Sequence, residues 1–301
     1  MRIVLVFILL AAVQVRAAGE PYALVTVKDG DAALVRDAGR YEFTEGVRLA
    51  AGDIVESTAG ARLVRIEFAD GYTLDLGPAT KALLVPHFAG ERARTARVYL
   101  LAGWAKLSAT ATPAETDGGA ALVATPVADV TAAGRGAVVR LEPGPPTSVA
   151  VFAESGTVAL AERSAKGGAE KVIALKTGEF YTRAANAPGV VTQRPNADFV
   201  DEVPRPFLDT LPRLASRFAA RDAAPKLTGP AGYADLAPWL GVEASLRPGF
   251  VARWKALAQQ PEFRKGLIAN MRAHSEWDRV VFPEKYVLRK PAPHVGAAPA
   301  H

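Results

Sequence analysis

Apolar and polar residues alternate along much of the first two thirds of the chain, from residue 24 to residue 183. Short segments rich in valine, leucine, isoleucine and threonine are separated by glycine or proline, a pattern typical of β-strands and turns. The alternation is strictest in residues 62–68 and 72–76, on either side of Asp70 and Gly71. Because glycine accepts the positive φ of a tight turn, the Asp-Gly pair predicts a β-hairpin. We therefore expect a mainly β N-terminal domain of short strands and hairpins.

A weak internal repeat marks three positions in this region. Residues 49–52, 100–103 and 175–178 each begin with leucine and end with glycine. Each copy predicts a strand end that turns at a glycine. The spacing fits either a repeated supersecondary unit or turn chemistry that any all-β fold reuses. The predicted structural turn residues are Gly52, Asp53, Asp70, Gly71, Gly103 and Gly178.

Beyond residue 183 the period of the apolar positions changes. Residues 184–197 have no sustained period and are rich in small residues and proline, which predicts a linker. Residues 198–288 then carry apolar side chains at helical spacing, which predicts a small α-helical C-terminal region. Residues 289–301 have little to bury, so we expect a disordered tail. We also expect residues 18–190 to fold without the C-terminal part.

Four helices are predicted within the C-terminal region. Two short ones are expected to begin at Pro206 and Pro212, because a proline in the first turn of a helix does no harm. Two longer ones are predicted over residues 249–259 and 261–274, where apolar residues form one stripe each. Such stripes normally pack against a core.

The first segment predicts export. An apolar run over residues 3–13 follows Arg2, and Val15 and Ala17 supply the residues at −3 and −1 that a signal peptidase needs. At about 1.5 Å per residue the run is too short for a bilayer core of roughly 30 Å, which argues against an uncleaved anchor. We therefore expect residues 1–17 to be a signal peptide cleaved after Ala17. The mature protein is expected to be secreted into the periplasm without a stable transmembrane anchor.

Composition argues against most kinds of enzyme chemistry. The 301 residues include no cysteine and four histidines, which excludes disulfides and thiolate sites and argues against a histidine-built metal site. The net charge of +5 is too small an excess for a nucleic-acid-binding protein of this size. No serine lies in a Gly-x-Ser-x-Gly motif. We expect no enzymatic activity, no cofactor, no metal and no nucleic-acid partner.

Two groups of polar residues could be mistaken for chemical sites. Asp70 and Asp75 flank the predicted hairpin, where Asp70 is explained as the turn residue and Asp75 as an outward strand position. His274 and Glu276 offer two metal ligands without a third and are typical of a helix end. Neither group is predicted to be catalytic.

Several motifs between residues 24 and 183 occur in an order that resembles the FecR domain. The motifs are residues 52–58 (GDIVEST), the hairpin 70–76 (DGYTLDL), 98–103 (VYLLAG), 124–128 (ATPVA), 147–158 and 175–179 (LKTGE). Tyr72 departs from the family pattern, which often has serine or threonine there. The resemblance implies a β-rich extracytoplasmic domain that binds or senses and carries no catalytic residues.

The resemblance also sets an expectation for function. In the best-known members of the family the domain lies behind a membrane helix and a cytoplasmic segment that controls a sigma factor during iron–siderophore uptake. Here only the predicted signal peptide precedes Leu24, so direct control of a sigma factor is not expected. We expect a non-enzymatic binding, sensing or assembly module of the cell envelope, with a protein or an envelope component as partner.

The alternative is a glycan- or peptidoglycan-binding accessory factor of a cell-wall enzyme. Exposed aromatic residues in a cleft would favour a glycan partner. An exposed strand edge or a flat apolar patch would favour a protein.

One stretch of the C-terminal region suggests a partner surface. Residues 253–290 hold nine lysines and arginines against four acidic residues, with aromatic residues between them. An anionic partner such as lipopolysaccharide, a phospholipid head group or an acidic protein face would fit. The alternative is a solvated helix face above core aromatics. The predicted partner-binding residues are Arg253, Trp254, Arg264, Lys265, Arg272 and Trp277.

Overall fold

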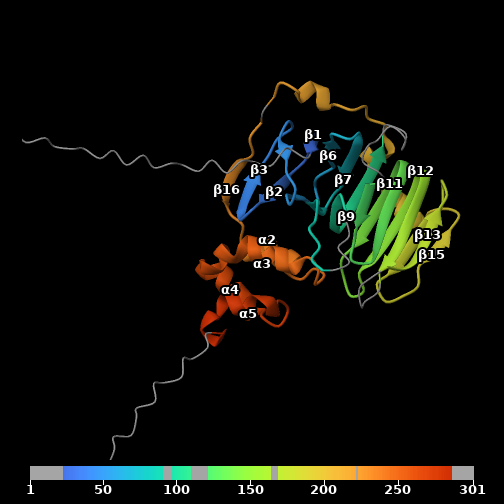
Figure 1. Ribbon diagram of the computed structural model, residues 1–301. Helices are drawn as coiled ribbons and strands as arrows, with labels where there is room; N and C mark the ends of the chain where they lie inside the picture. Colours follow the sequence, from blue (N-terminus) through green and yellow to red (C-terminus); the bar gives the residue numbers. More distant parts are fainter. Residues whose placement is uncertain (1–22, 91–95, 110–120, 164–168, 222, 287–301) are drawn as a thin grey trace, which may run out of the picture.

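The computed structural model describes residues 23–90, 96–109, 121–163, 169–221 and 223–286, and the sixteen strands in these ranges form one continuous sheet (Figure 1). The sheet folds into two packed layers. Layer one contains β2 (Ala32–Arg36), β3 (Gly39–Glu42), β5 (Ile54–Ser57), β8 (Lys81–Leu84), β10 (Ala121–Ala124), β13 (Ala169–Leu175) and β16 (Lys226–Pro230). Layer two contains β1 (Ala23–Asp29), β4 (Arg48–Leu49), β6 (Leu63–Phe68), β7 (Tyr72–Leu76), β14 (Phe180–Ala184) and β15 (Val190–Thr192).

Three long strands belong to both layers and join them: β9 (Val98–Ala109), β11 (Ala128–Glu142) and β12 (Ser148–Arg163). The first half of β9 pairs with β8 and its second half pairs with β7. Gly103 lies between the two halves with φ +86°, and a Cβ there would lie 2.5 Å from the Cα of Thr80. Only glycine fits this bend. The pairing of β11 shifts beside Gly136, and β12 changes its partner from β14 to β13 on either side of Gly156. Strands that change sheets at such bends close the corners of a β-sandwich.

The main core lies between the two layers, and period-two alternation explains how it is filled. Leu34 and Val55 point into the sandwich, whereas their neighbours Val35 and Ile54 point outward into a second apolar cluster. Both faces of layer one are therefore apolar, because both are covered. Successive residues of a strand point to opposite faces, so a strand buried on both sides shows a continuous apolar run.

The C-terminal region covers the outer faces of both layers (Figure 1). On layer two lie α1 (Ala197–Glu202) and the 3₁₀ turn η1 (Arg205–Leu208), and η2 (Ala215–Phe218) contacts β1. On layer one lie α2 (Tyr233–Leu240) and α3 (Arg247–Trp254), whose tryptophans Trp239 and Trp254 donate hydrogen bonds to Glu56 and Asp37. The rest of the helical region packs against these two helices and against itself: η3 (Lys255–Gln259), α4 (Pro261–Ala269), η4 (Ser275–Trp277), α5 (Asp278–Val281) and η5 (Pro283–Tyr286). The prediction of a mainly β N-terminal domain followed by a small helical region is confirmed.

The chain after α1 is held on layer two by buried charged side chains, and we call residues 205–218 the strap. Glu67 accepts hydrogen bonds from the backbone N–H groups of Leu214 and Ala215, at 2.7 and 3.1 Å. Lys106 donates to the carbonyl oxygen of Phe207. The polar face of β6, β7 and β9 is thus buried beneath the strap rather than solvated.

The predicted hairpin is confirmed. β6 and β7 pair antiparallel around Asp70 and Gly71, and Gly71 has φ +92°. The three glycines of the leucine-glycine repeat have nearly equal φ values, +85°, +86° and +88° at Gly52, Gly103 and Gly178. Their leucines, Leu49, Leu100 and Leu175, are all fully buried in the main core. Each copy of the repeat therefore places a buried leucine three residues before a glycine of positive φ, although Gly103 lies inside β9 and not at a strand end.

Several predicted boundaries differ from the structure. Residues 184–197, expected as a linker, contain β15, which pairs with β14. No helix begins at Pro212: residues 211–214 have no regular secondary structure, and the 3₁₀ turn η2 begins at Ala215. The predicted helix 249–259 is α3 followed by η3, and the helix predicted over 261–274 ends at Ala269.

The predicted signal peptide and the predicted tail over 289–301 lie outside the described residues. Among the residues that are described, no helix is long and apolar enough to cross a membrane.

Candidate functional site

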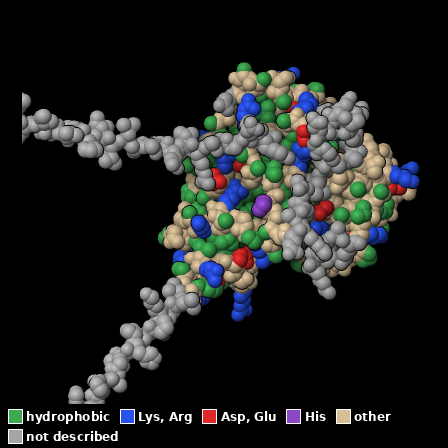
Figure 2. All heavy atoms as spheres, viewed as in Figure 1, with side chains coloured by type: hydrophobic (Ala, Val, Ile, Leu, Met, Phe, Trp, Pro, Cys, Tyr) green, Lys and Arg blue, Asp and Glu red, His purple; other side chains and the backbone are tan. Residues whose placement is uncertain are grey.

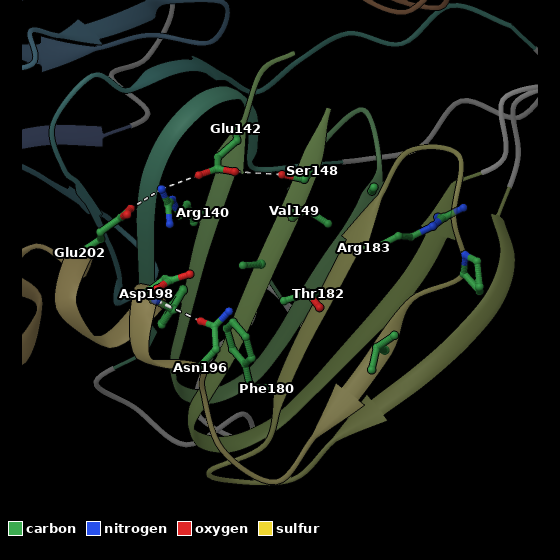
Figure 3. Close-up of a pocket in the computed structure, with 15 residues that line it drawn as sticks. Arg140, Glu142, Ser148, Val149, Phe180, Thr182, Arg183, Asn196, Asp198 and Glu202 are labelled. Atoms are coloured by element: carbon green, nitrogen blue, oxygen red, sulfur yellow. Dashed lines mark hydrogen bonds and ion pairs between the residues drawn. The ribbon is translucent and has the colours of Figure 1, made fainter. Parts of the chain in front are cut away.

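A groove of about 410 Å³ lies on the outer face of layer two, between the sheet and α1 (Figure 3). Strands β11, β12, β14 and β15 form its floor and one wall, and the chain from residue 196 to residue 202 forms the other. The labelled side chains around it in Figure 3 are Arg140, Glu142, Ser148, Val149, Phe180, Thr182, Arg183, Asn196, Asp198 and Glu202.

Aromatic rings fix α1 against the sheet. Phe199 of α1 packs on Phe180 and Trp104, with ring centroids 4.7 and 5.2 Å away. The side chain of Asn196 accepts a hydrogen bond of 3.0 Å from the backbone N–H of Phe199 and so caps the helix. The buried ring of Phe199 therefore holds α1 on the sheet, while Asp198 and Glu202 lie at the edge of the groove.

The charges in the groove are mixed and mostly paired. Arg140 forms ion pairs with Glu142 and Glu202, and its guanidinium lies 5.0 Å from the ring centroid of Trp104. Ser148 donates to Glu142 at 3.1 Å. Each of these two carboxylates is therefore bound to the same arginine.

Arg183 is held differently, by neutral backbone groups. Its guanidinium donates to the carbonyl oxygens of Val127 and Ala187, at 2.9 and 3.0 Å. These two bonds tie the turn that leads into β15 to the body of the sandwich. The position of β15 is thereby fixed.

β15 forms an exposed edge beside the groove. In the described part of the chain it pairs with β14 only, so its outer backbone groups face away from the sheet. Val190 and Val191 are 55% and 41% exposed, and Val190 also lines the groove. Val200 on α1 is exposed as well. An exposed edge with β-branched apolar residues is a template for a further strand.

The predicted partner-binding residues do not form one surface. Trp254 and Trp277 are buried in the cluster between the helices and layer one. Arg253 donates to backbone carbonyls of Gly52 and Val35, and Arg264 donates to the carbonyl of Val281.

Lys265 and Arg272 are exposed. Figure 2 shows basic side chains dispersed over the visible face, with acidic ones among them. Trp254 and Trp277 therefore belong to the core, as the alternative interpretation of this stretch predicts. Partner binding stays a prediction for the exposed residues Lys265 and Arg272.

The two groups of polar residues noted in the sequence, Asp70 with Asp75 and His274 with Glu276, make structural contacts. Asp75 binds Arg65, and Asp70 binds Arg97. His274 is buried, and its Nε2 lies 2.7 Å from the hydroxyl of Tyr233. Burial lowers the pKa of His274, against the opposing attraction of Glu276. Among the described residues, no group of three or more possible ligands could hold a metal ion.

Sequence reasoning missed the groove and its edge because both depend on β15. Val190, Val191 and Thr192 are three β-branched residues in succession, a strand signal. It was outweighed by the prolines and small residues around it. The turn predictions at Gly52, Asp53, Asp70, Gly71 and Gly178 fell on true turns.

No protein-family model matches the chain, and no curated protein matches it. Among solved structures, two crystal structures of "a putative anti-sigma factor from Parabacteroides distasonis ATCC 8503" are similar to it. Each shares 19% sequence identity with the chain, covers 49% of this chain and 62% of the other, and superposes with a TM-score of 0.37. The match thus spans less than two thirds of the length of these neighbours.

Proposed function

We propose that the chain is an exported FecR-domain protein that acts in the periplasm as a non-enzymatic binding, sensing or assembly module. Its partner in this proposal is a protein of the cell envelope, which adds an extended segment to β15. The observation that carries the proposal is the edge of β15, with two exposed valines beside a groove of mixed charge.

The groove and the edge act together in this proposal. A strand that pairs with β15 would gain main-chain hydrogen bonds, which supply affinity without regard to sequence. Because Val190 belongs both to the edge and to the groove, alternate side chains of the added strand would reach Thr182 and the charged rim. Those contacts would supply the specificity.

The exposed side chains favour a protein over a glycan. Among the described aromatic residues, Tyr286 is the one that is exposed, and it lies on η5, far along the chain from the groove. The other large exposed apolar side chains are valines, leucines and an isoleucine. Glycan recognition by stacking on aromatic rings is therefore the weaker alternative for this face.

Site-specific photo-crosslinking in intact cells of the native host tests the proposal. A crosslinking residue placed at Val191 should give one discrete protein adduct, identified by mass spectrometry. The matched control is the same residue at Val172, which is 72% exposed on the edge strand β13. The adduct should disappear when Val190→Glu is added.

Three results would overturn the proposal. They are an equal yield of adduct at Val172, an adduct that muramidase digests, and no adduct at Val191.

A further inference from the structure

A second pocket, of about 250 Å³, lies between layer one and α3, whereas the groove lies on layer two. Its walls are apolar and include Leu83, Val85, Pro86 and Phe250. Arg253 and His87 are the basic side chains that line it. The pocket shares none of its lining residues with the groove, so a ligand bound in it is independent of the proposed function.

Arg253 brings a positive charge into this pocket without a carboxylate bound to it. It donates hydrogen bonds to the carbonyl oxygens of Gly52 and Val35, which are neutral, and its Nε is buried with no hydrogen-bond partner. The nearby carboxylate of Asp53 is engaged by Arg36 through two hydrogen bonds of 2.9 and 2.6 Å.

The electrostatic balance of Arg253 agrees with this incomplete pairing. Burial lowers the pKa of Arg253, and the attraction of Asp37 and Asp53 only partly offsets it, while Arg36 acts in the same direction as burial. A buried cation gains most from an anion that binds it directly. The guanidinium of Arg253 in the pocket therefore has no anion bound directly to it among the described residues.

The wall opposite α3 is held in a strained conformation. Val85 has φ +46°, a region that β-branched residues rarely occupy. Its backbone N–H donates to the carbonyl of Arg97, and the nearby N–H of Ala89 donates to the carbonyl of Ser245 in the helical region. The surrounding structure therefore enforces this shape, and strain of this kind collects at ligand sites.

The helical wall leaves room at its mouth. Gly249 lies inside α3 and lines the pocket, and a Cβ at this position would meet nothing within 4 Å. A glycine inside a helix costs about 0.5–1 kcal/mol relative to alanine. No neighbouring atom requires the glycine, so residue 249 is a position at which a larger side chain can be introduced beside the pocket.

We propose that this pocket binds a small carboxylate with a short apolar body. The carboxylate would bind the guanidinium of Arg253, because a planar guanidinium matches a carboxylate with two parallel hydrogen bonds. The apolar body would lie against Leu83, Val85 and Phe250. The volume lies just below the usual range of roughly 300–1,000 Å³ for ligand sites, so the body contains only a few carbons.

Such a ligand has two sources, a free short-chain acid or the carboxyl-terminal residue of a polypeptide. Isothermal titration of the full chain with hexanoate and with N-acetyl-leucine separates them. Hexanol and hexylamine, which keep the apolar body but lack the anion, are the chemical controls. At least one of the two carboxylates should bind at least tenfold more tightly than both controls.

Two variants test the site itself. Arg253→Gln removes the charge, and Gly249→Phe places a ring over the mouth of the pocket; each should weaken carboxylate binding at least tenfold. Gly60→Phe and Arg264→Gln are the matched controls, since neither residue lines the pocket and a Cβ at residue 60 likewise meets nothing within 4 Å. Both controls should bind as the unmodified chain does.

Gly249→Phe keeps the test valid if Arg253→Gln fails to fold, because a Cβ at residue 249 meets no neighbouring atom within 4 Å. The proposal is overturned if hexanol binds as well as hexanoate, or if Gly249→Phe retains full affinity. It is also overturned if neither carboxylate binds.

Discussion

Arg65 and Asp75 face each other across β6 and β7 and form a two-pronged ion pair, with both N···O distances at 2.7 Å. The pair is buried beneath the strap, and the remaining nitrogen of Arg65 donates to the carbonyl oxygen of Leu211. The ion pair therefore joins two neighbouring strands to a segment distant in sequence. The outward position predicted for Asp75 is correct, but its surroundings are the buried face under the strap.

Removing one partner of this pair should be costly. Asp75→Ala leaves Arg65 buried without its counter-charge, and we expect a loss of about 3–5 kcal/mol in the free energy of unfolding. Urea denaturation measures it. The control is Asp29→Ala, which breaks the exposed pair between Arg62 and Asp29 and should cost about 0–1 kcal/mol. Equal losses for the two variants would show that the buried pair has no special role.

The bend in β9 can be tested with two glycines of nearly equal φ. Gly178→Ala strains the backbone alone, because a Cβ there meets nothing within 4 Å, and should cost about 1–3 kcal/mol. Gly103→Ala adds a collision with the backbone of Thr80, so the loss in the free energy of unfolding should be clearly larger. If the two variants melted at the same temperature, close approach at Gly103 would not be what requires a glycine.

The buried His274 should make stability depend on pH. Burial lowers its folded-state pKa below the ordinary value of about 6.5. Below that value the unfolded chain binds the proton more readily than the folded one, so stability falls as the pH falls.

We expect the melting temperature of the unmodified chain to drop between pH 7.5 and pH 5.5 by more than that of His274→Gln. The control Tyr233→Phe keeps the buried imidazole and removes the hydroxyl bound to its Nε2, so it should keep a pH dependence. Parallel pH profiles for the unmodified chain and His274→Gln would exclude His274 as the group responsible.

Independent folding of the N-terminal domain remains a prediction. The structure shows which apolar residues an isolated domain would expose to solvent. A fragment of residues 18–190 lacks the helices that cover Val35, Ile54 and Leu83. We expect circular dichroism to show retained β-structure, with strong binding of a hydrophobic dye to the uncovered face. An unfolded fragment would mean that the two regions form one cooperative unit.

The local pattern of the sequence determined the strands and the turns. Alternation around Asp70 and Gly71 predicts the β6–β7 hairpin because both the period and the turn residue are local properties. The amphipathic stripes of the C-terminal region likewise predict helices close to α3 and α4. The fold class follows from these elements without knowledge of their arrangement.

Tertiary structure alone decided what each face meets. The alternation shows that Leu34 and Val35 lie on opposite faces of the strand. Only the path of the chain decides that Leu34 faces layer two and Val35 faces the helices. Trp254 shares a stretch with basic residues, yet packing places it in the core.

Both candidate sites depend in the same way on contacts between distant residues. Val190 becomes an edge only when β15 pairs with β14, and Arg253 lines a pocket only when α3 lies against layer one. Period and turn chemistry act over a few residues, whereas these contacts join segments far apart in the chain, so no local pattern carries them.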